Sequence, residues 1–338
     1  MSDVQARPAV QECGGQREHT DVRVVERLPG REVSLTTRLT PSPGSLREAL
    51  TVRRFLPTRG RRMIGAWCFV DRFGPDDISA TDGMVMGPHP HTGLQTVTWL
   101  LDGEVLHLDS VGSRQTIVPG QLNLMTAGQG ISHAEASPKE RPDVLHGLQL
   151  WVALPAAHRD RTPAFEHHDQ LPRLVLPGLE ATVLMGTLAG VGSPASTYTP
   201  LVGAVLTVAG NRHGADEAAA WLPLRRGFEY GLLVVDGDLM VDGEPAGNDE
   251  LIYLGTGRDG LDLASSRGCR VLLIGGAPFE EEILMWWNFI GRTHDEVVTA
   301  RTLWNAHAPR FGRVEGSEAA RIPAPPMPAS TLRSRGRR

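Results

Sequence analysis

A strand-like run that ends in Asp-Gly occurs twice in this chain and limits the folds that it can adopt. Residues 95–101 alternate along the chain and lead into Asp102-Gly103, and residues 231–238 repeat this pattern around Asp236-Gly237. Alternation with a period of two is typical of β-strands, and Asp-Gly is a strong signal for a tight hairpin. Similar short runs, separated by Gly, Pro and Asp turns, fill residues 22–154 and 181–276. We therefore predict an all-β protein with two antiparallel β-barrels.

The composition fits a protein with two hydrophobic cores. The chain has 338 residues, and its net charge of −5 gives no general attraction to nucleic acid or to anionic membranes. No apolar run approaches the roughly 18 residues that a membrane-spanning helix needs.

The three cysteines, Cys13, Cys68 and Cys269, lack Cys-x-x-Cys spacing, which argues against a disulfide framework. We expect a protein of the reducing cytoplasm, with Cys68 and Cys269 buried in core strands and Cys13 in a flexible lead.

Two pairs of potential metal ligands stand out, and each pair has one residue between its members. They are His89 with His91, and His133 with Glu135. Side chains two apart on a β-strand point to the same face, so two such pairs on neighbouring strands aim four ligands at one point. Histidine and carboxylate suit Fe(II), Mn, Ni or Cu better than a structural zinc site, which favours thiolates. The pattern predicts a metal centre inside the first barrel.

The strings around these ligands resemble the pirin family, a group of two-barrel cupins. Gly83 with His89-Pro90-His91 resembles the first cupin motif, and Gly112, Pro119-Gly120 and Gly130-Ile131-Ser132-His133 resemble the second. The strings that resemble pirins are Arg53-Arg54-Phe55-Leu56-Pro57, Arg61-Arg62-Met63-Ile64-Gly65, Val70-Asp71-Arg72-Phe73-Gly74-Pro75, Pro88-His89-Pro90-His91, Met125-Thr126-Ala127-Gly128 and His146-Gly147-Leu148-Gln149-Leu150-Trp151. The resemblance is dense from about Thr51 to Pro155 and extends to about Arg292. It implies a bicupin of jelly-roll type with one mononuclear metal, usually iron, held by the positions His89, His91, His133 and Glu135.

The chain departs from the cupin pattern at one position. A glutamate usually follows the histidine pair by three to four residues, and this chain has Gln95 there. By strand parity with His89 and His91, Gln95 is expected to face the metal cavity. A neutral amide is a poor ligand, so Glu135 must supply the carboxylate. His107 and Asp109 form a further pair, for which we expect a hydrogen bond at the barrel mouth; the alternative is that they orient a ligand imidazole.

The second barrel is expected to lack a metal. Superposing the two Asp-Gly turns places Pro223 and Arg225 at the positions of His89 and His91, and Glu229 at that of Gln95. The segment opposite His133, residues 255–262, contains no histidine. We therefore predict one metal per chain and a structural role for the second barrel.

The resemblance implies two alternative functions. Some pirins are credited with quercetin 2,3-dioxygenase activity, in which a flavonol ring is cleaved and carbon monoxide is released, and we favour this reading. Glu135 would then also be a catalytic base for a flavonol or another enediol-like substrate. Other pirins are iron-dependent, redox-sensitive regulators that act on a protein partner without turnover, here through the surface around Arg53, Arg54, Arg61 and Arg62. Direct contact with nucleic acid or membrane is not expected.

We expect the chain to divide into five parts. They are a flexible lead (1–21), a metal-binding cupin (22–155), a linker (156–180), a degenerate cupin (181–292) and a C-terminal extension (293–338) that is disordered from about Ser317. Pro278 and the acidic residues after it predict the start of a helix. Ile283, Trp286, Trp287 and Ile290 recur at helical spacing, so this helix is expected to pack across the barrels.

Overall fold

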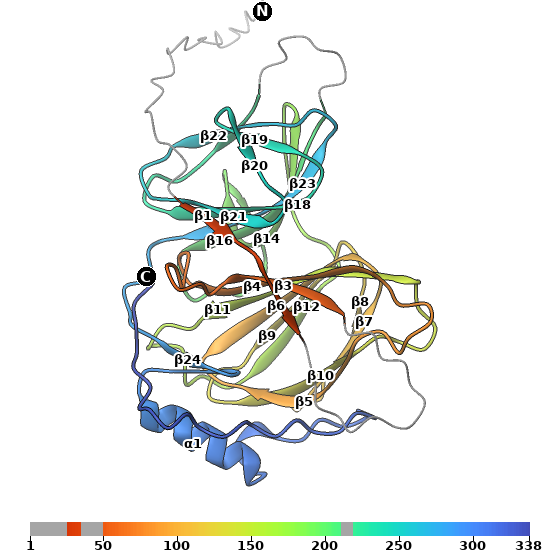
Figure 1. Ribbon diagram of the computed structural model, residues 1–338, viewed down its shortest axis with the longest axis vertical. Helices are drawn as coiled ribbons and strands as arrows, with labels where there is room; N and C mark the ends of the chain where they lie inside the picture. The colour runs from red at the N-terminus through yellow and green to blue at the C-terminus, as the bar shows by residue number, and fades with distance from the viewer. Residues whose placement is uncertain (1–25, 35–49, 211–218) are drawn as a thin grey trace, which may run out of the picture.

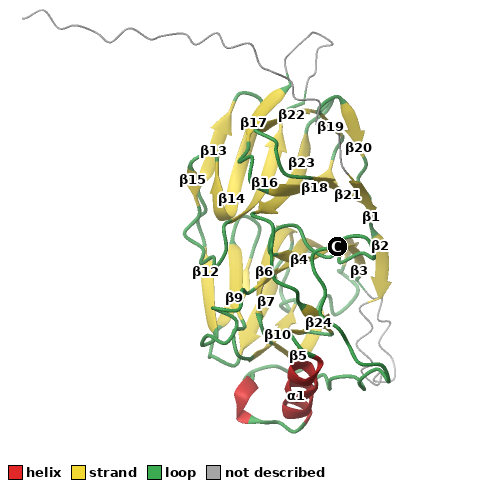
Figure 2. Ribbon diagram, turned by 90° about the vertical axis from the view of Figure 1, so that its left-hand side faces the viewer, coloured by secondary structure: helices red, strands yellow, loops and turns green. Residues whose placement is uncertain are grey.

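The protein consists of two β-barrels of jelly-roll type, one above the other, in a computed structural model that describes residues 26–34, 50–210 and 219–338 (Figure 1). Each barrel is formed by two facing sheets, and every pair of strands in them is antiparallel (Figure 2). The predicted all-β bicupin is confirmed. The predicted lead and Cys13 lie outside the described residues.

The first barrel has a large sheet and a small one. In spatial order the large sheet comprises β12 (Ala164–His168), β9 (Leu122–Thr126), β6 (Leu94–Asp102), β11 (Val144–Ala153), β4 (Trp67–Asp77), β3 (Thr51–Leu56) and β2 (Arg31–Ser34). The small sheet comprises β5 (Val85–His91), β10 (Ile131–Ala136), β7 (Val105–Asp109) and β8 (Arg114–Ile117). The predicted hairpin follows β6, and Gly103 adopts φ 86° in its turn, a conformation that favours glycine.

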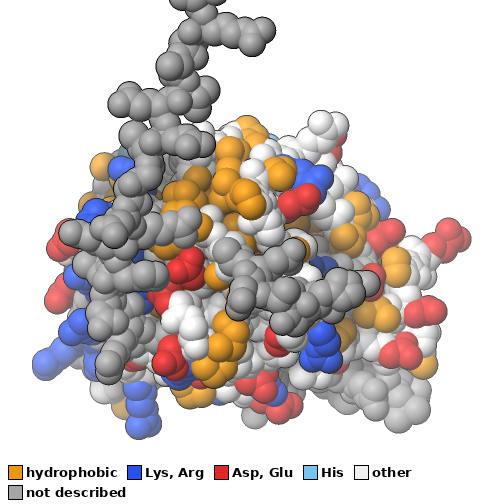
Figure 3. Space-filling model, turned by 90° about the horizontal axis from the view of Figure 1, so that it is seen from above, with side chains coloured by type: hydrophobic (Ala, Val, Ile, Leu, Met, Phe, Trp, Pro, Cys, Tyr) orange, Lys and Arg blue, Asp and Glu red, His pale blue; other side chains and the backbone are white. Residues whose placement is uncertain are grey.

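The second barrel repeats this arrangement. Its large sheet comprises β1 (Glu26–Pro29), β21 (Glu250–Leu254), β18 (Glu229–Asp236), β23 (Cys269–Gly276), β16 (Leu201–Val208), β14 (Leu179–Leu188) and β13 (Arg173–Leu176), with β15 (Val191–Gly192) paired to β14. Its small sheet comprises β17 (Ala220–Pro223), β22 (Gly260–Ala264), β19 (Leu239–Val241) and β20 (Glu244–Ala246). The end of this barrel carries acidic and basic side chains side by side, so neither sign of charge dominates the described part of that face (Figure 3).

The two large sheets pack against each other and share one hydrophobic core. This core contains Trp67, Val97 and Leu150 of the first barrel together with Leu233 and Ile274 of the second. Apolar burial on this scale is the main force that holds two sheets together. The barrels therefore form one packed unit.

Two polar contacts fix how the barrels meet. The Trp67 indole N–H lies 3.0 Å from the Val202 carbonyl oxygen, and a Cβ on Gly203 would lie 2.7 Å from the Trp67 ring, which explains the glycine. The fully buried Glu229 accepts hydrogen bonds from the Gly65 backbone N–H and the Tyr253 hydroxyl, both at 2.7 Å. In the second barrel, the residue aligned with Gln95 therefore serves the interface between the barrels.

Two strands belong to a different barrel or domain from the one expected from the sequence. The N-terminal strand β1 falls in the expected first domain but pairs with β21 of the second barrel. Strand β12 falls in the expected linker but pairs with β9 of the first barrel. These pairings join residues far apart in the chain, so no local pattern could have indicated them.

The predicted helix after Pro278 is wrong, and the helix begins further along the chain. Residues 284–291 form a hairpin of β24 (Leu284–Trp286) and β25 (Phe289–Gly291), with Trp287 at φ 52° in the turn. Helix α1 (His294–Asn305) follows, and the short 3₁₀ helix η1 (Pro309–Phe311) comes after it. The Thr293 hydroxyl caps α1 by accepting the Glu296 backbone N–H at 3.2 Å. Thr-x-x-Glu is the sequence signature of such a start.

Helix α1 lies at the end of the first barrel that is remote from the second barrel, rather than across both barrels (Figures 1 and 2).

The acidic residues after Phe279 do not cap a helix. The Glu281 carboxylate accepts the Ala156 backbone N–H at 2.9 Å and forms an ion pair with Arg292.

The C-terminal extension is packed on the first barrel, and the predicted disorder from about Ser317 is wrong. The Ile322 backbone N–H donates to the Pro88 carbonyl (2.9 Å) at the edge strand β5, and Arg335 exchanges two backbone hydrogen bonds with Ile283. Ala324 is buried in a cluster with Trp304 of α1, and Leu332 packs against this cluster. The segment has no regular secondary structure, so its order depends on hydrogen bonds to other elements.

In the ranges described, no helix is long and apolar enough to cross a membrane.

Cys68 and Cys269 are buried, as predicted, and we expect neither to react with a thiol reagent in the native protein. Burial raises the pKa of Cys68 to about 12 and that of Cys269 to about 11, so the reactive thiolate is scarce at neutral pH. Mass spectrometry after brief alkylation should detect no label on Cys68 or Cys269, whereas both should be labelled in the denatured chain. Rapid labelling of either buried thiol would contradict this placement.

Candidate metal centre

The small sheet of the first barrel places the predicted ligands on adjacent strands. His89 and His91 lie on β5, and His133 and Glu135 lie on β10. The two strands are antiparallel, with His133 opposite His89. The register shifts between His133 and Glu135, so that Glu135 lies opposite Met86. The strand register thus brings the two predicted pairs together.

The three histidine rings form a compact cluster. Their ring centroids lie 4.3 Å (His89–His133), 4.9 Å (His91–His133) and 5.1 Å (His89–His91) apart. The Nε2 atoms of His91 and His133 are 3.0 Å apart. Each ring offers a nitrogen to a group whose ligand atoms all lie within 4.8 Å of one another. This is the geometry of three donors around a single ion.

The electrostatics of the cluster favour a metal over protons. Burial lowers the pKa of His89 to about 4 and the pKa values of His91 and His133 well below the ordinary range. Nearby histidines lower the pKa of His91 and His133 further, because protonated rings repel one another. Neutral imidazole is the form that binds metals. His89 also donates from Nδ1 to the Gly87 carbonyl (2.9 Å), which leaves its Nε2 lone pair free.

Glu135 belongs to a second group that overlaps the first. The ligand atoms of His107, His133 and Glu135 also lie within 4.8 Å of one another, so His133 is common to both groups. Burial raises the pKa of Glu135, although His107 and Thr98 partly oppose this shift. A carboxylate whose charge is poorly solvated gains most from a cation, so the residues present fit a metal ion. The chain therefore contains a His/Glu metal-binding site.

The expectation that Gln95 faces the metal is wrong. Its side-chain amide donates to the Thr126 hydroxyl (3.0 Å) and to the Ser196 carbonyl (3.1 Å), which lies beyond the first barrel. The chain turns at Thr92-Gly93, where Gly93 has φ 72°, and passes from the small sheet to the large one. Strand parity is therefore not carried from β5 to β6.

The large sheet contributes polar side chains from β6 and β11 to the metal centre, and these were not among the predicted site residues. The Thr98 hydroxyl lies 3.1 Å from Gln149 Oε1 and 3.5 Å from Glu135 Oε1. Trp151, two residues after Gln149 on β11, meets the His91 ring edge-on at a centroid distance of 5.2 Å. The signal for Thr98 was present: in β6, Thr96 and Thr98 alternate with Val97 and Trp99, and the two apolar residues belong to the core between the barrels.

The expected hydrogen bond between His107 and Asp109 is present. His107 Nε2 lies 3.2 Å from Asp109 Oδ2, and both residues are buried. The bond lies beside the histidine cluster, because β7 pairs with β10 and places Asp109 opposite His133.

The described part of the second barrel contains no comparable group of His, Cys, Asp and Glu side chains. Pro223 ends the short strand β17, and Arg225, in the turn that follows, is exposed. Arg225 stacks on the Phe228 ring, with its guanidinium carbon 4.5 Å from the ring centroid.

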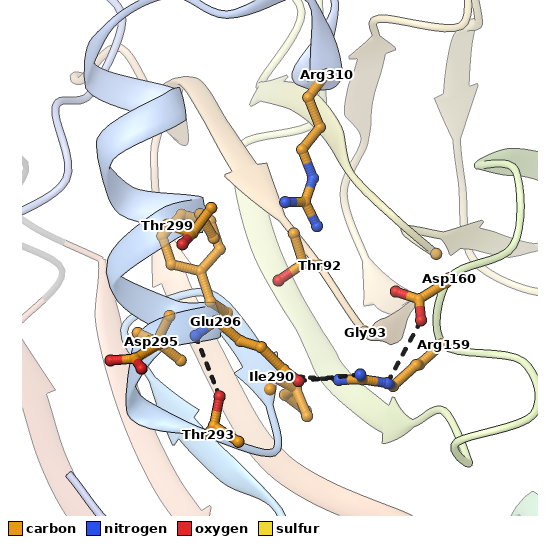
Figure 4. A pocket seen from close by; sticks show the side chains of 15 residues that line it. Thr92, Gly93, Arg159, Asp160, Ile290, Thr293, Asp295, Glu296, Thr299 and Arg310 are labelled. Carbon is orange, nitrogen blue, oxygen red and sulfur yellow. Dashed lines mark hydrogen bonds and ion pairs between the residues drawn. The ribbon is translucent and has the colours of Figure 1, made fainter.

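A separate polar cavity of about 300 Å³ lies between the first barrel and the start of α1 (Figure 4). Thr92, the neighbour of His91, lines it together with Arg159, Glu296 and Arg310. Arg159 makes a two-pronged ion pair with Glu296, and Arg310 donates to the Gln129 carbonyl at 2.6 Å. These contacts tie α1 and η1 to the barrel behind the metal-bearing strand.

Comparison with known proteins decides the family. The family model described as "Pirin" matches residues 49–152, and the model described as "Pirin C-terminal cupin domain" matches residues 214–312. The Pseudomonas aeruginosa protein named "Putative quercetin 2,3-dioxygenase PA1205" is 48% identical over 312 residues, which cover 92% of this chain and 96% of that protein. The chain belongs to the pirin family. A "Pirin-like protein" of Caulobacter vibrioides is 31% identical over 80% of this chain and 94% of its own length.

A solved structure supports the same assignment. A crystal structure of quercetin 2,3-dioxygenase from Acinetobacter baumannii matches with a TM-score of 0.82 and 42% sequence identity. The match covers 91% of this chain and 97% of that one. The likeness therefore extends over both barrels.

Proposed function

We propose that this pirin is an iron-dependent quercetin 2,3-dioxygenase of the cytoplasm, with His89, His91, His133 and Glu135 as the metal ligands. The buried histidine cluster beside Glu135 is the observation that carries the proposal. Histidine and carboxylate donors that leave coordination positions open are typical of iron sites that react with O₂. The names of the relatives at 48% and 42% identity support a flavonol as substrate. The buried free thiols Cys68 and Cys269 suit a reducing compartment.

The residues of the metal centre have distinct roles in this proposal. Bound iron supplies the open positions and the redox couple that flavonol cleavage by O₂ needs. Glu135 is the carboxylate beside the histidine cluster, and it accepts the proton of the flavonol hydroxyl. Trp151 stacks on Phe69 at 4.1 Å and meets the His91 ring edge-on, so it holds this imidazole in place. Thr98 places a hydroxyl 3.5 Å from Glu135 Oε1 and 3.1 Å from Gln149 Oε1, so the carboxyl group has a polar neighbour on the large sheet.

The alternative of a redox-sensing regulator gains no support from the arginines expected to form its docking surface. Arg54 makes two hydrogen bonds of 2.8 Å to Asp71. Arg61 is 3% exposed and stacks on Tyr253 at 3.4 Å. Arg53 forms an ion pair with Asp249, and Arg62 donates to the Arg338 carbonyl. These arginines are engaged within the protein, largely where the two barrels and the C-terminal segment meet.

The proposal is tested by O₂ consumption. Protein loaded anaerobically with Fe(II) and then given quercetin in air-saturated buffer should consume O₂ in proportion to the flavonol lost and release carbon monoxide. The metal-free protein is the matched control and should do neither. If the iron-loaded protein consumes no O₂ with quercetin or with related enediol-like compounds, the dioxygenase proposal is wrong.

A further inference from the structure

The ligand His133 is connected to a buried carboxylate through a second imidazole. Asp109 anchors this chain of contacts: its Oδ1 atom accepts the backbone N–H groups of Val111 (3.0 Å) and Ser113 (2.9 Å). Its Oδ2 atom lies 3.2 Å from His107 Nε2. Asp109 is 3% exposed. The turn after β7 therefore holds this carboxylate in one orientation.

His107 occupies the middle position. Its ring stacks on Phe165 with a centroid distance of 4.5 Å and an interplanar angle of 19°, and the residue is 3% exposed. An ionised carboxylate only accepts hydrogen bonds, so His107 Nε2 must carry the hydrogen that bonds Asp109. His107 Nδ1 is then an acceptor, and it lies 3.5 Å from His133 Nδ1, at the outer limit of a direct hydrogen bond.

These contacts select one tautomer of His133. When Nδ1 donates to His107, the lone pair of His133 is on Nε2, and Nε2 is the atom that lies 3.0 Å from His91 Nε2. His89 differs, because its outer nitrogen donates to the neutral Gly87 carbonyl. An imidazole that donates toward an anion is a stronger electron donor than one that donates to a carbonyl.

We propose that Asp109 and His107 form a positioning relay that fixes the tautomer of His133 and thereby sets how tightly, and in which oxidation state, the metal is held. The relay rests on the metal site of the proposed function but on no substrate. The overlapping group of His107, His133 and Glu135 offers a competing arrangement, in which His107 is itself a ligand. In that arrangement His133 would bind the metal through Nδ1, which faces His107. Its Nε2, which faces His91 Nε2, would not be a ligand.

Asp109→Asn tests the relay with little change in shape. The amide oxygen can still accept the two backbone N–H groups, but the amide nitrogen then faces His107 Nε2 as a donor. His107 must then carry its hydrogen on Nδ1. This hydrogen would face the one on His133 Nδ1, and the two would repel each other. We expect Fe(II) affinity, measured by chelator competition, to fall about 10- to 100-fold with one metal still bound per chain at saturation. The reduction potential of bound iron should rise, because a weaker donor stabilises Fe(III) less.

Asp102→Asn is the matched control. Asp102 also accepts a backbone N–H in a turn of the same barrel, from Gly103 at 2.8 Å. This substitution should leave iron affinity and potential unchanged. If Asp109→Asn behaves like the control in both measurements, the relay does not exist.

His107→Phe provides a second test should Asp109→Asn fold poorly. Phenylalanine keeps the ring that stacks on Phe165 and removes both nitrogens. One metal per chain, bound more weakly and at a higher potential, is the expected result. Wild-type affinity would refute the relay, and loss of the bound metal at saturation would identify His107 as a ligand instead. None of these measurements uses quercetin, so a failure of the relay and a failure of the dioxygenase proposal are separable.

Discussion

His89→Ala should abolish stoichiometric metal binding. The substitution removes one nitrogen from the three-ring cluster and leaves His91, His133 and Glu135 as donors. Loss of a direct ligand should weaken Fe(II) binding by more than the roughly 10- to 100-fold that an outer contact contributes. Metal analysis after gel filtration should find about one iron per wild-type chain and almost none in the variant. Thermal unfolding of both metal-free proteins would show that the barrel still folds.

Arg225→Ala is the control for this experiment. Arg225 stands at the position in the second barrel that aligns with His91, and it is exposed and stacked on Phe228. Its removal should leave the iron content unchanged. Two ions per wild-type chain, or an iron content that falls in Arg225→Ala, would show that the second barrel binds a metal and overturn its structural role.

The sequence predicted those features that depend on a few adjacent residues. The alternation before Asp102-Gly103 and before Asp236-Gly237 places β6 and β18 correctly, because strand periodicity and turn chemistry are local. The placement of His89 and His91 on the same face of β5 was predictable for the same reason, because side-chain parity holds within one strand.

Features that depend on how strands pair across the chain were not predictable in this way. Gln95 was assigned to the wrong face because the chain changes sheets at Gly93, and parity has no meaning across that turn. The pairing of β1 with β21 joins residues more than two hundred positions apart. His107 enters the metal centre through the register of β7 against β10, which the spacing of His107 and Asp109 does not determine.

The C-terminal region shows two further causes of error. Four apolar residues at helical spacing predicted a helix, but Trp287 lies in a tight turn between β24 and β25. The better signal was Thr293-x-x-Glu296, where the capping hydroxyl begins α1. The proline-rich segment after it lacks periodicity, yet Ile322 bonds the open edge of β5. An unpaired strand edge elsewhere in the molecule thus supplied order that the composition of the segment did not indicate.

Glu135→Gln should separate metal binding from proton transfer. The change is nearly isosteric, and the three histidines remain, so the barrel should fold and still bind iron, although less tightly because an anionic oxygen has become neutral. If Glu135 accepts the flavonol proton, the amide cannot replace it. Turnover per bound iron should then fall by about 10²- to 10⁴-fold, the usual contribution of a general base.

The comparison requires matched metal content, since a loss of iron alone would also lower the activity. Wild type and Glu135→Gln are each titrated with Fe(II) under anaerobic conditions, and the initial rate of O₂ consumption with quercetin is divided by the iron bound. Thr98→Val is a useful intermediate, because it leaves the carboxylate and removes the hydroxyl that lies 3.5 Å from Glu135 Oε1. A small loss in Thr98→Val and a large one in Glu135→Gln would indicate a base whose orientation matters less than its charge. Equal turnover per iron in wild type and Glu135→Gln would leave Glu135 as a ligand alone, and the proton would need another acceptor near the metal centre.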